Sequence, residues 1–230
     1  MEYQRIMIFA AHADDEMTMS GTMAKAAAAG TRVVVVQMTD GCEGYPRAEM
    51  RDQIVAMRRQ EAEAANQVLG VARRIFIEAP DMGLVDDKET LHKCIVAIRG
   101  ERPEAIFTHG PVDGHRDHRN THAISVDARW HAGEPVSATL GEPWRTPFLF
   151  YYKGVRDPLP TLIHDVTGYA HKRYEARATQ VSQHTLFGST REDMLAEARH
   201  IEAARPRSQE TFWIAEANRW PGFPKGYRAS

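Results

Sequence analysis

The chain has 230 residues, of which 43% are hydrophobic and 26% are charged, and its formal net charge is -2. This length suits one α/β domain with a substantial core, and we expect residues 1–230 to form a single domain. The near-balanced charge and the lack of any extended Lys/Arg run argue against nucleic acid as a partner.

The composition of the apolar stretches and the cysteine content predict a cytoplasmic protein. The longest apolar runs, such as RVVVVQM, are too short to span a bilayer. The N-terminal stretch MEYQRIMIFAAHADDE lacks the shape of a signal peptide, because acids follow its apolar segment at once. Cys42 and Cys94 have no metal-type spacing, so we expect reduced thiols.

The first half of the chain alternates short apolar runs with helical patterns. A buried strand is predicted over 5–11 and an Ala-rich helix over 16–30, with Glu16 in its first turn. There follow a β-branched strand over 32–39, a long helix over 48–70, a strand over 73–79, a helix over 87–100 and a strand over 104–109. Asp86 or Asp87 is the expected cap of the third helix.

The second half continues the pattern. A helix is predicted from about Asp117 to Trp130, strands over 148–154 and 161–167, and two closing helices over 168–180 and 191–204. The aromatic tail, residues 211–227, is expected to pack on the body or to form a subunit contact. The alternation predicts an α/β fold, a Rossmann-like three-layer sandwich with a mostly parallel sheet and helices on both faces.

Two unusual loops follow the first and fourth predicted strands. They are HADDE, residues 12–16, and GPVDGHRDHRNTH, residues 110–122. In doubly wound sheets, ligands bind beyond the carboxyl ends of the strands, where the strand order reverses. The usual order places strands two and three on one side of strand one and strand four on the other. We therefore expect the two loops to flank one crevice.

Carboxylates and imidazoles around a crevice favour a catalytic metal site. A catalytic zinc ion takes about three N or O protein ligands and leaves a position for water. An unliganded Asp beside it can act as general base, and a second His can protonate a leaving amine. Asp14 and Asp15 leave the strand in different directions, so we expect them to have different roles. Asp117 can orient an imidazole as an outer carboxylate does.

These stretches resemble a known family. AHADDE and the distant HRDH are similar to the patterns (A/P)-H-P-D-D-E and H-x-D-H of the LmbE/PIG-L family of zinc-dependent N-deacetylases. The further pieces that fit are VVQMTDG, RRQEAEAANQVLGV, APDMGL and HKRYEARATQVSQ, so the similarity covers about residues 4–185. It implies removal of the N-acetyl group from an N-acetylglucosamine-type amino sugar or its conjugate.

The resemblance also implies site residues and a cofactor. Its metal ligands fall on His12, Asp15 and His118, and the metal is Zn²⁺, although N/O sites also accept Fe²⁺, Co²⁺ or Mn²⁺. Its general base falls on Asp14. The His that acts as acid or stabilises the oxyanion falls on His115, with Asp117 in support. Arg58 matches an arginine near the substrate, and the family often assembles into trimers or hexamers.

Some features depart from the family pattern or leave alternatives open. Ala13 replaces the usual Pro, which removes a fixed φ but no functional group. Gln180 stands where many members have His, and Cys42 and Tyr45 lie in a loop that is expected to rim the pocket, which leaves the substrate open. His122 is an alternative ligand, and His109 either lines the pocket or simply ends its strand. The rival functions are an amidase that cleaves a larger N-acyl or thiol-conjugate substrate, and a non-catalytic sugar- or nucleotide-binding module. The absence of a G-x-G-x-x-G fingerprint after the first strand counts against dinucleotide binding.

Overall fold

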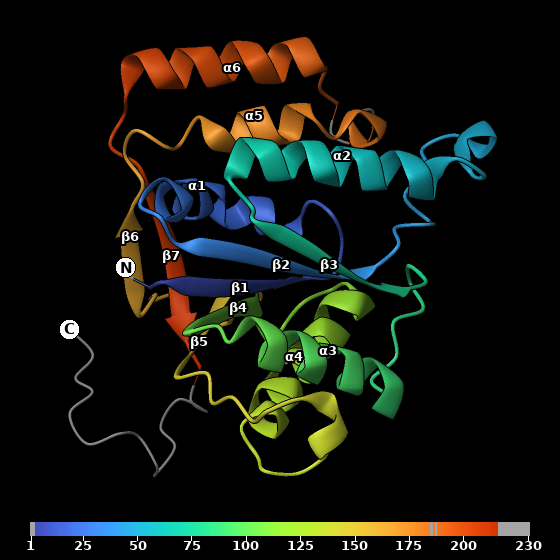
Figure 1. Ribbon diagram of the computed structural model, residues 1–230. Helices are drawn as coiled ribbons and strands as arrows, with labels where there is room; N and C mark the ends of the chain where they lie inside the picture. Colours follow the sequence, from blue (N-terminus) through green and yellow to red (C-terminus); the bar gives the residue numbers. More distant parts are fainter. Residues whose placement is uncertain (1–2, 185, 187, 216–230) are drawn as a thin grey trace.

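The computed structural model describes residues 3–184, 186 and 188–215 (Figure 1). Seven strands form a sheet in the order β3-β2-β1-β4-β5-β7-β6. Their bounds are β1 (Arg5–Ala10), β2 (Arg32–Thr39), β3 (Arg73–Ala79), β4 (Ala105–His109), β5 (Phe148–Lys153), β6 (Leu162–Asp165) and β7 (Gln209–Ile214). The predicted α/β class with a mostly parallel sheet is confirmed.

The strand order reverses at β1, as the sequence predicts. β1 pairs in parallel with β2 on one side and β4 on the other, so that Ile6 lies opposite both Val33 and Ala105. β7, which was not predicted from the sequence, pairs antiparallel with β5 and β6. The start of the aromatic tail therefore packs into the sheet, and its remainder from residue 216 lies outside the described residues.

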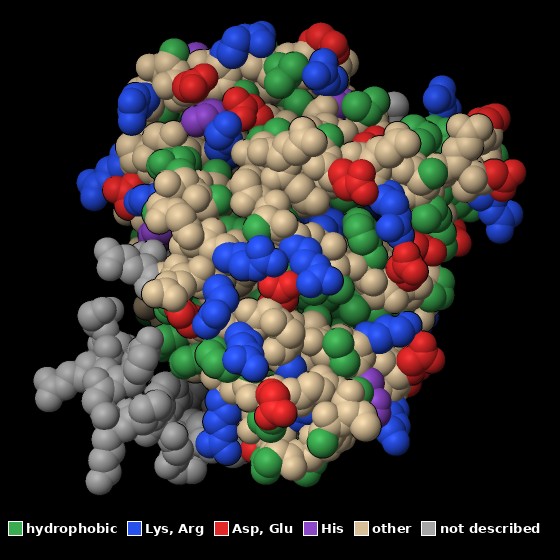
Figure 2. Space-filling model, in the orientation of Figure 1, with side chains coloured by type: hydrophobic (Ala, Val, Ile, Leu, Met, Phe, Trp, Pro, Cys, Tyr) green, Lys and Arg blue, Asp and Glu red, His purple; other side chains and the backbone are tan. Residues whose placement is uncertain are grey.

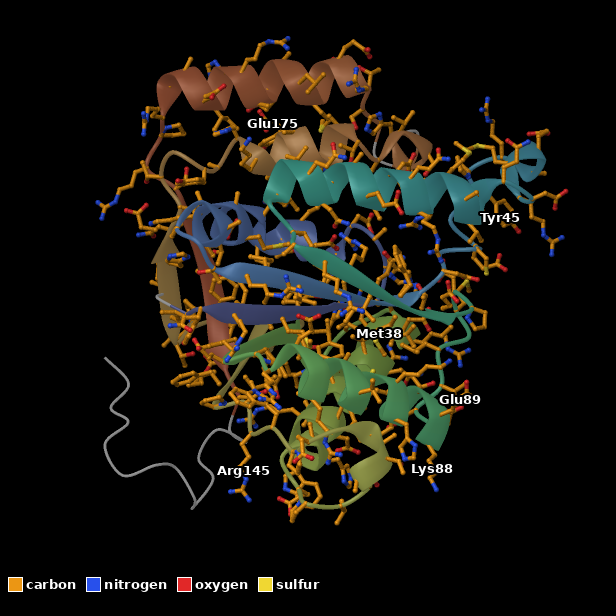
Figure 3. All side chains as sticks on the ribbon, viewed as in Figure 1. Met38, Tyr45, Lys88, Glu89, Arg145 and Glu175 are labelled. Carbon is orange, nitrogen blue, oxygen red and sulfur yellow. The ribbon has the colours of Figure 1, made fainter. Side chains whose placement is uncertain are left out.

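Helices cover both faces of the sheet (Figure 1). α1 (Ser20–Ala28), α2 (Ile54–Leu69) and α5 (Lys172–Ala178) lie on one face, and α6 (Arg191–Ala204) lies outside α5. α3 (Lys88–Glu101) and α4 (Arg116–Ala132) lie on the other face. Figure 3 labels Glu175 between α5 and α6, where its carboxylate is 2.7 Å from Nζ of Lys172.

The alternation of side chains along β1 builds two cores. Ile6 and Ile8 point into the cluster that lies under α1 and α2, whereas Met7 and Phe9 point into the cluster under α3 and α4. All four side chains are buried. A strand with apolar residues on both faces is typical of a sheet covered by helices on both sides.

Three predicted helices begin later than the sequence indicates, and one of them is α5, which starts at Lys172 rather than at residue 168. The first is a 3-10 helix over Asp15–Met19, and α1 starts only at Ser20. Glu16 does lie in this first turn, but it is fully buried and pairs with Arg74 of β3, so tertiary contacts override helix propensity there. Residues 48–53 are mostly exposed, and α2 starts at Ile54. By contrast, the Asp87 carboxylate caps α3 by accepting the Thr90 N–H at 2.8 Å.

Among the described residues, no helix combines the length and the apolar character needed to cross a bilayer. Figure 2 shows Lys and Arg side chains interspersed with Asp and Glu over the visible face.

Candidate functional site

The loops after β1 and β4 meet beyond the carboxyl end of the sheet. The ring centroid of His12 lies 4.7 Å from that of His115 and 5.3 Å from that of His118. Oδ1 of Asp15 lies 3.2 Å from Nε2 of His118. The reversal of strand order at β1 thus brings the two sequence motifs together.

His12 lies among carboxylates from three segments of the chain. Its Nε2 is 3.0 Å from Oδ1 of Asp81, in the loop after β3, and 3.6 Å from Oδ2 of Asp117. Its Nδ1 is 3.4 Å from Oδ2 of Asp15. Burial alone would lower the pKa of His12, but hydrogen bonding with Asp117, Asp15 and Asp81 outweighs burial and raises the pKa to about 11. The imidazole is therefore a cation wherever no metal holds it.

Asp15 is buried and surrounded by nitrogen atoms. Its Oδ2 accepts the backbone N–H of His12 at 2.8 Å and lies 3.3 Å from Nε2 of His109. Its Oδ1 lies 2.6 Å from Nζ of Lys153, at the end of β5. Burial alone would raise the pKa of Asp15, but the charge and hydrogen bond of His109 and the hydrogen bonds of His118 and His12 hold it well below its usual range. The carboxylate is ionised at neutral pH.

The first turn of α4 positions His115 and Asp117. His115 is the N-cap of α4, and its Nδ1 accepts the backbone N–H of Asp117 at 3.2 Å. Burial and the charges of His12 and His118 lower the pKa of His115. The neutral ring therefore carries its proton on Nε2.

The carboxylate of Asp117 faces His12 rather than the ring of His115. It is fully buried, accepts the backbone N–H of Met82 at 2.7 Å through Oδ2, and has no hydrogen-bond partner for Oδ1 among the described residues. Nδ1 of His118 lies 3.0 Å from Oδ2 of Asp113, close enough for an ion pair although not aligned as a hydrogen bond. Outer carboxylates thus accompany His12 and His118, two of the three imidazoles that face Asp15.

Asp14 lies apart from this cluster and contacts Arg58. Its Oδ1 is 3.5 Å from Nη2 of Arg58, whose side chain is buried. The loop after β2 packs on this guanidinium, and a Cβ at Gly44 would lie 2.3 Å from Nη1 of Arg58. Figure 3 places Tyr45 on this loop, where it leads into α2. Close packing of this loop therefore holds the Arg58 guanidinium against Asp14.

The cluster fits a divalent cation. Ligands about 2.0–2.1 Å from one tetrahedral ion are separated by about 3.3 Å. Nδ1 of His12 lies 3.4 Å from Oδ2 of Asp15, and Nε2 of His118 lies 3.2 Å from Oδ1 of Asp15, so each imidazole is near that separation from a different oxygen of the carboxylate. Three groups in the crevice bring ligand atoms within 4.8 Å of one another: His12, His115 and His118; His12, Asp81, His115 and Asp117; and Asp15, His109 and His118. None of these groups unites all three ligands expected from the sequence, because His12 and Asp15 each join His118 in a different group.

Asp113 and Lys153 were not assigned a role at the site from sequence, whereas Asp81 was matched to the family through the segment APDMGL. Asp81 and Asp113 contact the imidazoles, and Lys153 contacts Asp15. The one available signal for Lys153 is that a lone charge closes the apolar run FLFYY at a carboxyl strand end. His122, the alternative ligand, lies with Nδ1 3.0 Å from the carbonyl oxygen of His109 and belongs to none of the three groups.

The part of the chain that contains both loops matches a known protein family. Residues 7–129, a little over half of the chain, match the sequence profile of a family described as GlcNAc-PI de-N-acetylase (PIG-L). The chain is 31% identical over 180 residues to 1D-myo-inositol 2-acetamido-2-deoxy-alpha-D-glucopyranoside deacetylase of Rhodococcus jostii. That match covers 66% of this chain and 62% of the relative, so the chain spans less than two thirds of the relative's length.

Solved structures share the fold over almost the whole chain. N,N'-diacetylchitobiose deacetylase from Pyrococcus horikoshii superposes with a TM-score of 0.78 at 25% identity, covering 93% of this chain and 84% of that one. 4-Carboxy-2-hydroxymuconate hydratase from Pseudomonas putida superposes with a TM-score of 0.76 at 21% identity, covering 99% of both chains. At 21% identity, the similarity to the hydratase shows a shared fold and nothing about function.

Proposed function

The chain belongs to the GlcNAc-PI de-N-acetylase (PIG-L) family, and from this premise we propose that it is a metal-dependent N-deacetylase of an N-acetylglucosamine-type amino sugar or its conjugate. The observation that carries the proposal is that Asp15, the neighbour of Asp14 in the chain, lies between two imidazoles, with its carboxylate oxygens 3.4 Å from Nδ1 of His12 and 3.2 Å from Nε2 of His118. In the reaction, the amide C–N bond breaks, the acyl carbon gains a water oxygen, and acetate and a free amine leave.

We infer that Nδ1 of His12, the carboxylate of Asp15 and Nε2 of His118 hold the metal. Zinc is the proposed ion, because a catalytic zinc site takes three such ligands. When bound, a divalent ion supplies Lewis-acid chemistry, which lowers the pKa of water and polarises a carbonyl oxygen. Asp81 lies 3.0 Å from Nε2 of His12, which favours a proton there and leaves Nδ1 as the ligand atom.

We propose that Asp14 transfers the proton and that His115 donates a hydrogen bond. Asp14 accepts a proton from the attacking water, and Arg58 orients its carboxylate. The Nε2–H group of His115 donates a hydrogen bond to the carbonyl oxygen as negative charge develops there. We propose that Asp14, after it has taken the proton from water, passes this proton on to the departing nitrogen.

The domain organisation, the cellular location and the oligomeric state of the protein are also proposals. We propose that residues 1–230 work as one catalytic domain in the cytoplasm. The trimer or hexamer implied by the family resemblance stays a prediction, which light scattering after size-exclusion chromatography tests.

The proposed activity is tested with zinc-loaded protein and a panel of acylated amino sugars. We expect equal amounts of acetate and free amine from N-acetylglucosamine conjugates, loss of turnover with a chelator, and recovery with added Zn²⁺. Release of amine only from longer acyl chains would favour the amidase instead. Protein that binds sugars without stoichiometric metal or turnover would favour the binding module.

A further inference from the structure

Lys153 reaches the candidate metal site from a strand end that lies outside both sequence motifs. It is the last residue of β5, and its backbone lies beside that of His109 at the end of β4. The side chain is partly exposed, and its Nζ donates a hydrogen bond to Oδ1 of the buried Asp15 at 2.6 Å. A positive charge therefore touches one of the three side chains that we assign to the metal.

The orientation of Asp15 does not depend on Lys153 alone. Oδ2 of Asp15 accepts the backbone N–H of His12 at 2.8 Å, and the N–H of Asp15 points to the carbonyl oxygen of His12 at 3.5 Å. The loop after β1 thus holds this carboxylate through its own backbone. The distinct contribution of Lys153 is its charge, because the loop already supplies a hydrogen bond to Asp15.

The oxygen that Lys153 contacts also faces a proposed metal ligand. Oδ1 of Asp15 lies 3.2 Å from Nε2 of His118 and 2.6 Å from Nζ of Lys153. A divalent ion held by Asp15 and His118 therefore meets a positive charge on the same carboxylate. Like charges repel at short range, and the repulsion is stronger at a buried site than in water.

Lys153 also balances an excess of negative charge around the imidazoles. The carboxylates of Asp15, Asp81 and Asp117 surround His12, and that of Asp113 lies beside His118. A buried carboxylate without a cation beside it is costly, so Lys153 stabilises the fold at Asp15. Without Lys153 the crevice would be more negative and would attract a divalent ion more strongly.

We propose that Lys153 is a built-in competitor of the metal, whose ammonium group neutralises Asp15 and so weakens the binding of a divalent ion to His12, Asp15 and His118. The inference rests on the ligands of the proposed function and goes beyond it, because it assigns a charge that works against the metal. Lys153 acts through Asp15 and is a positioning residue that sets the metal affinity.

Zinc affinity, measured by competition with a chromophoric chelator, tests the proposal. Lys153→Met removes the charge and the hydrogen bond, whereas Lys153→Gln removes the charge but keeps a donor. We expect both variants to bind Zn²⁺ at least about tenfold more tightly than the parent protein. Lys153→Arg keeps the charge and should stay near the parental affinity. So should Lys88→Met, which removes an exposed charge at the start of α3 (Figure 3).

Thermal unfolding gives a second readout. In excess chelator, Lys153→Met should unfold at a lower temperature than the parent protein, because a buried carboxylate has lost its cation. In saturating Zn²⁺ this difference should shrink, since the ion supplies the charge and binds the variant more tightly. An equal loss in both conditions would mean that Lys153 serves packing alone and would overturn the proposal.

Two results of the affinity measurement would also overturn it. Unchanged or weaker zinc binding by both uncharged variants would mean that Lys153 does not oppose the metal. Tighter binding by Lys153→Met but not by Lys153→Gln would assign the effect to the hydrogen bond rather than to the charge.

Turnover separates this proposal from the deacetylase function. Zinc-loaded parent protein that releases acetate from no sugar would contradict the function, whereas the order of zinc affinities would still decide the role of Lys153. If the parent protein binds no zinc, binding that appears only in the uncharged variants would support the competitor role. The absence of zinc binding by the parent protein and by both uncharged variants would overturn both proposals.

Discussion

Nε2 of His12 lies 3.0 Å from Oδ1 of Asp81, a residue of the loop that follows β3. This contact turns Nδ1 of the same ring towards Asp15, at 3.4 Å. A carboxylate behind a ligand imidazole fixes its tautomer and its orientation, and removing such a partner typically costs about 10- to 100-fold in metal affinity.

We therefore expect Asp81→Asn to weaken zinc binding by about 10- to 100-fold, because the amide cannot hold the imidazole as the carboxylate does. Competition with a chromophoric chelator measures the affinity. Asp86→Asn is the matched control, since Asp86 is an exposed acid of the same loop. Equal affinities for the two variants would contradict the positioning role of Asp81.

Metal binding should release a proton from His12. The pKa of this imidazole is raised to about 11 in the metal-free protein, whereas an imidazole that ligates a metal must be neutral. At pH 7 we expect about one proton released per ion, and a metal affinity that rises about tenfold per pH unit as the pH increases towards 11. Calorimetry in buffers of different ionisation enthalpy counts the protons. Binding heats that are the same in every buffer would rule out a protonated His12.

Asp14→Asn should lower kcat by about 10²- to 10⁴-fold, the usual contribution of a general base. Metal content should stay at that of the parent protein, because Asp14 contacts Arg58 and none of the three ligand groups includes it. Turnover and bound zinc are measured on the same preparation. Parental turnover in this variant would show that another group takes the proton.

A methyl group added at Gly44 tests whether close packing around Arg58 matters for activity. In Gly44→Ala the added Cβ would lie 2.3 Å from Nη1 of Arg58, so the guanidinium must move relative to Asp14. We expect kcat/KM to fall by about 10- to 100-fold, as misplacement by about 1 Å can do. Gly100→Ala is the control, because its Cβ would meet nothing within 4 Å and it lies inside α3. That control should keep full activity and gain about 0.5–1 kcal/mol in the free energy of unfolding.

The elements and their order could be predicted from the sequence because their signals are local. Asp87 is a cap that acts three residues away on Thr90, and the predicted helix over 191–204 coincides with α6. The meeting of the loops after β1 and β4 followed from one topological rule. β7 was missed because its pairing with β5 and β6 depends on contacts with strands far away in the chain.

The surroundings of the site were harder to predict for the same reason. Asp81, Asp113 and Lys153 each come from a different loop or strand end, and only the folded sheet brings them to His12, His118 and Asp15. The carboxylate of Asp117 faces His12 because α4 begins with His115 as its cap, a detail of backbone geometry. Which nitrogen each ring offers to a metal also depends on these contacts.

Anomalous diffraction at the zinc edge, from crystals grown with zinc, tests the central claim most directly. The account predicts one strong peak within about 2.0–2.2 Å of Nδ1 of His12, the Asp15 carboxylate and Nε2 of His118. A peak elsewhere in the crevice, or one that leaves either imidazole outside bonding distance, would contradict it.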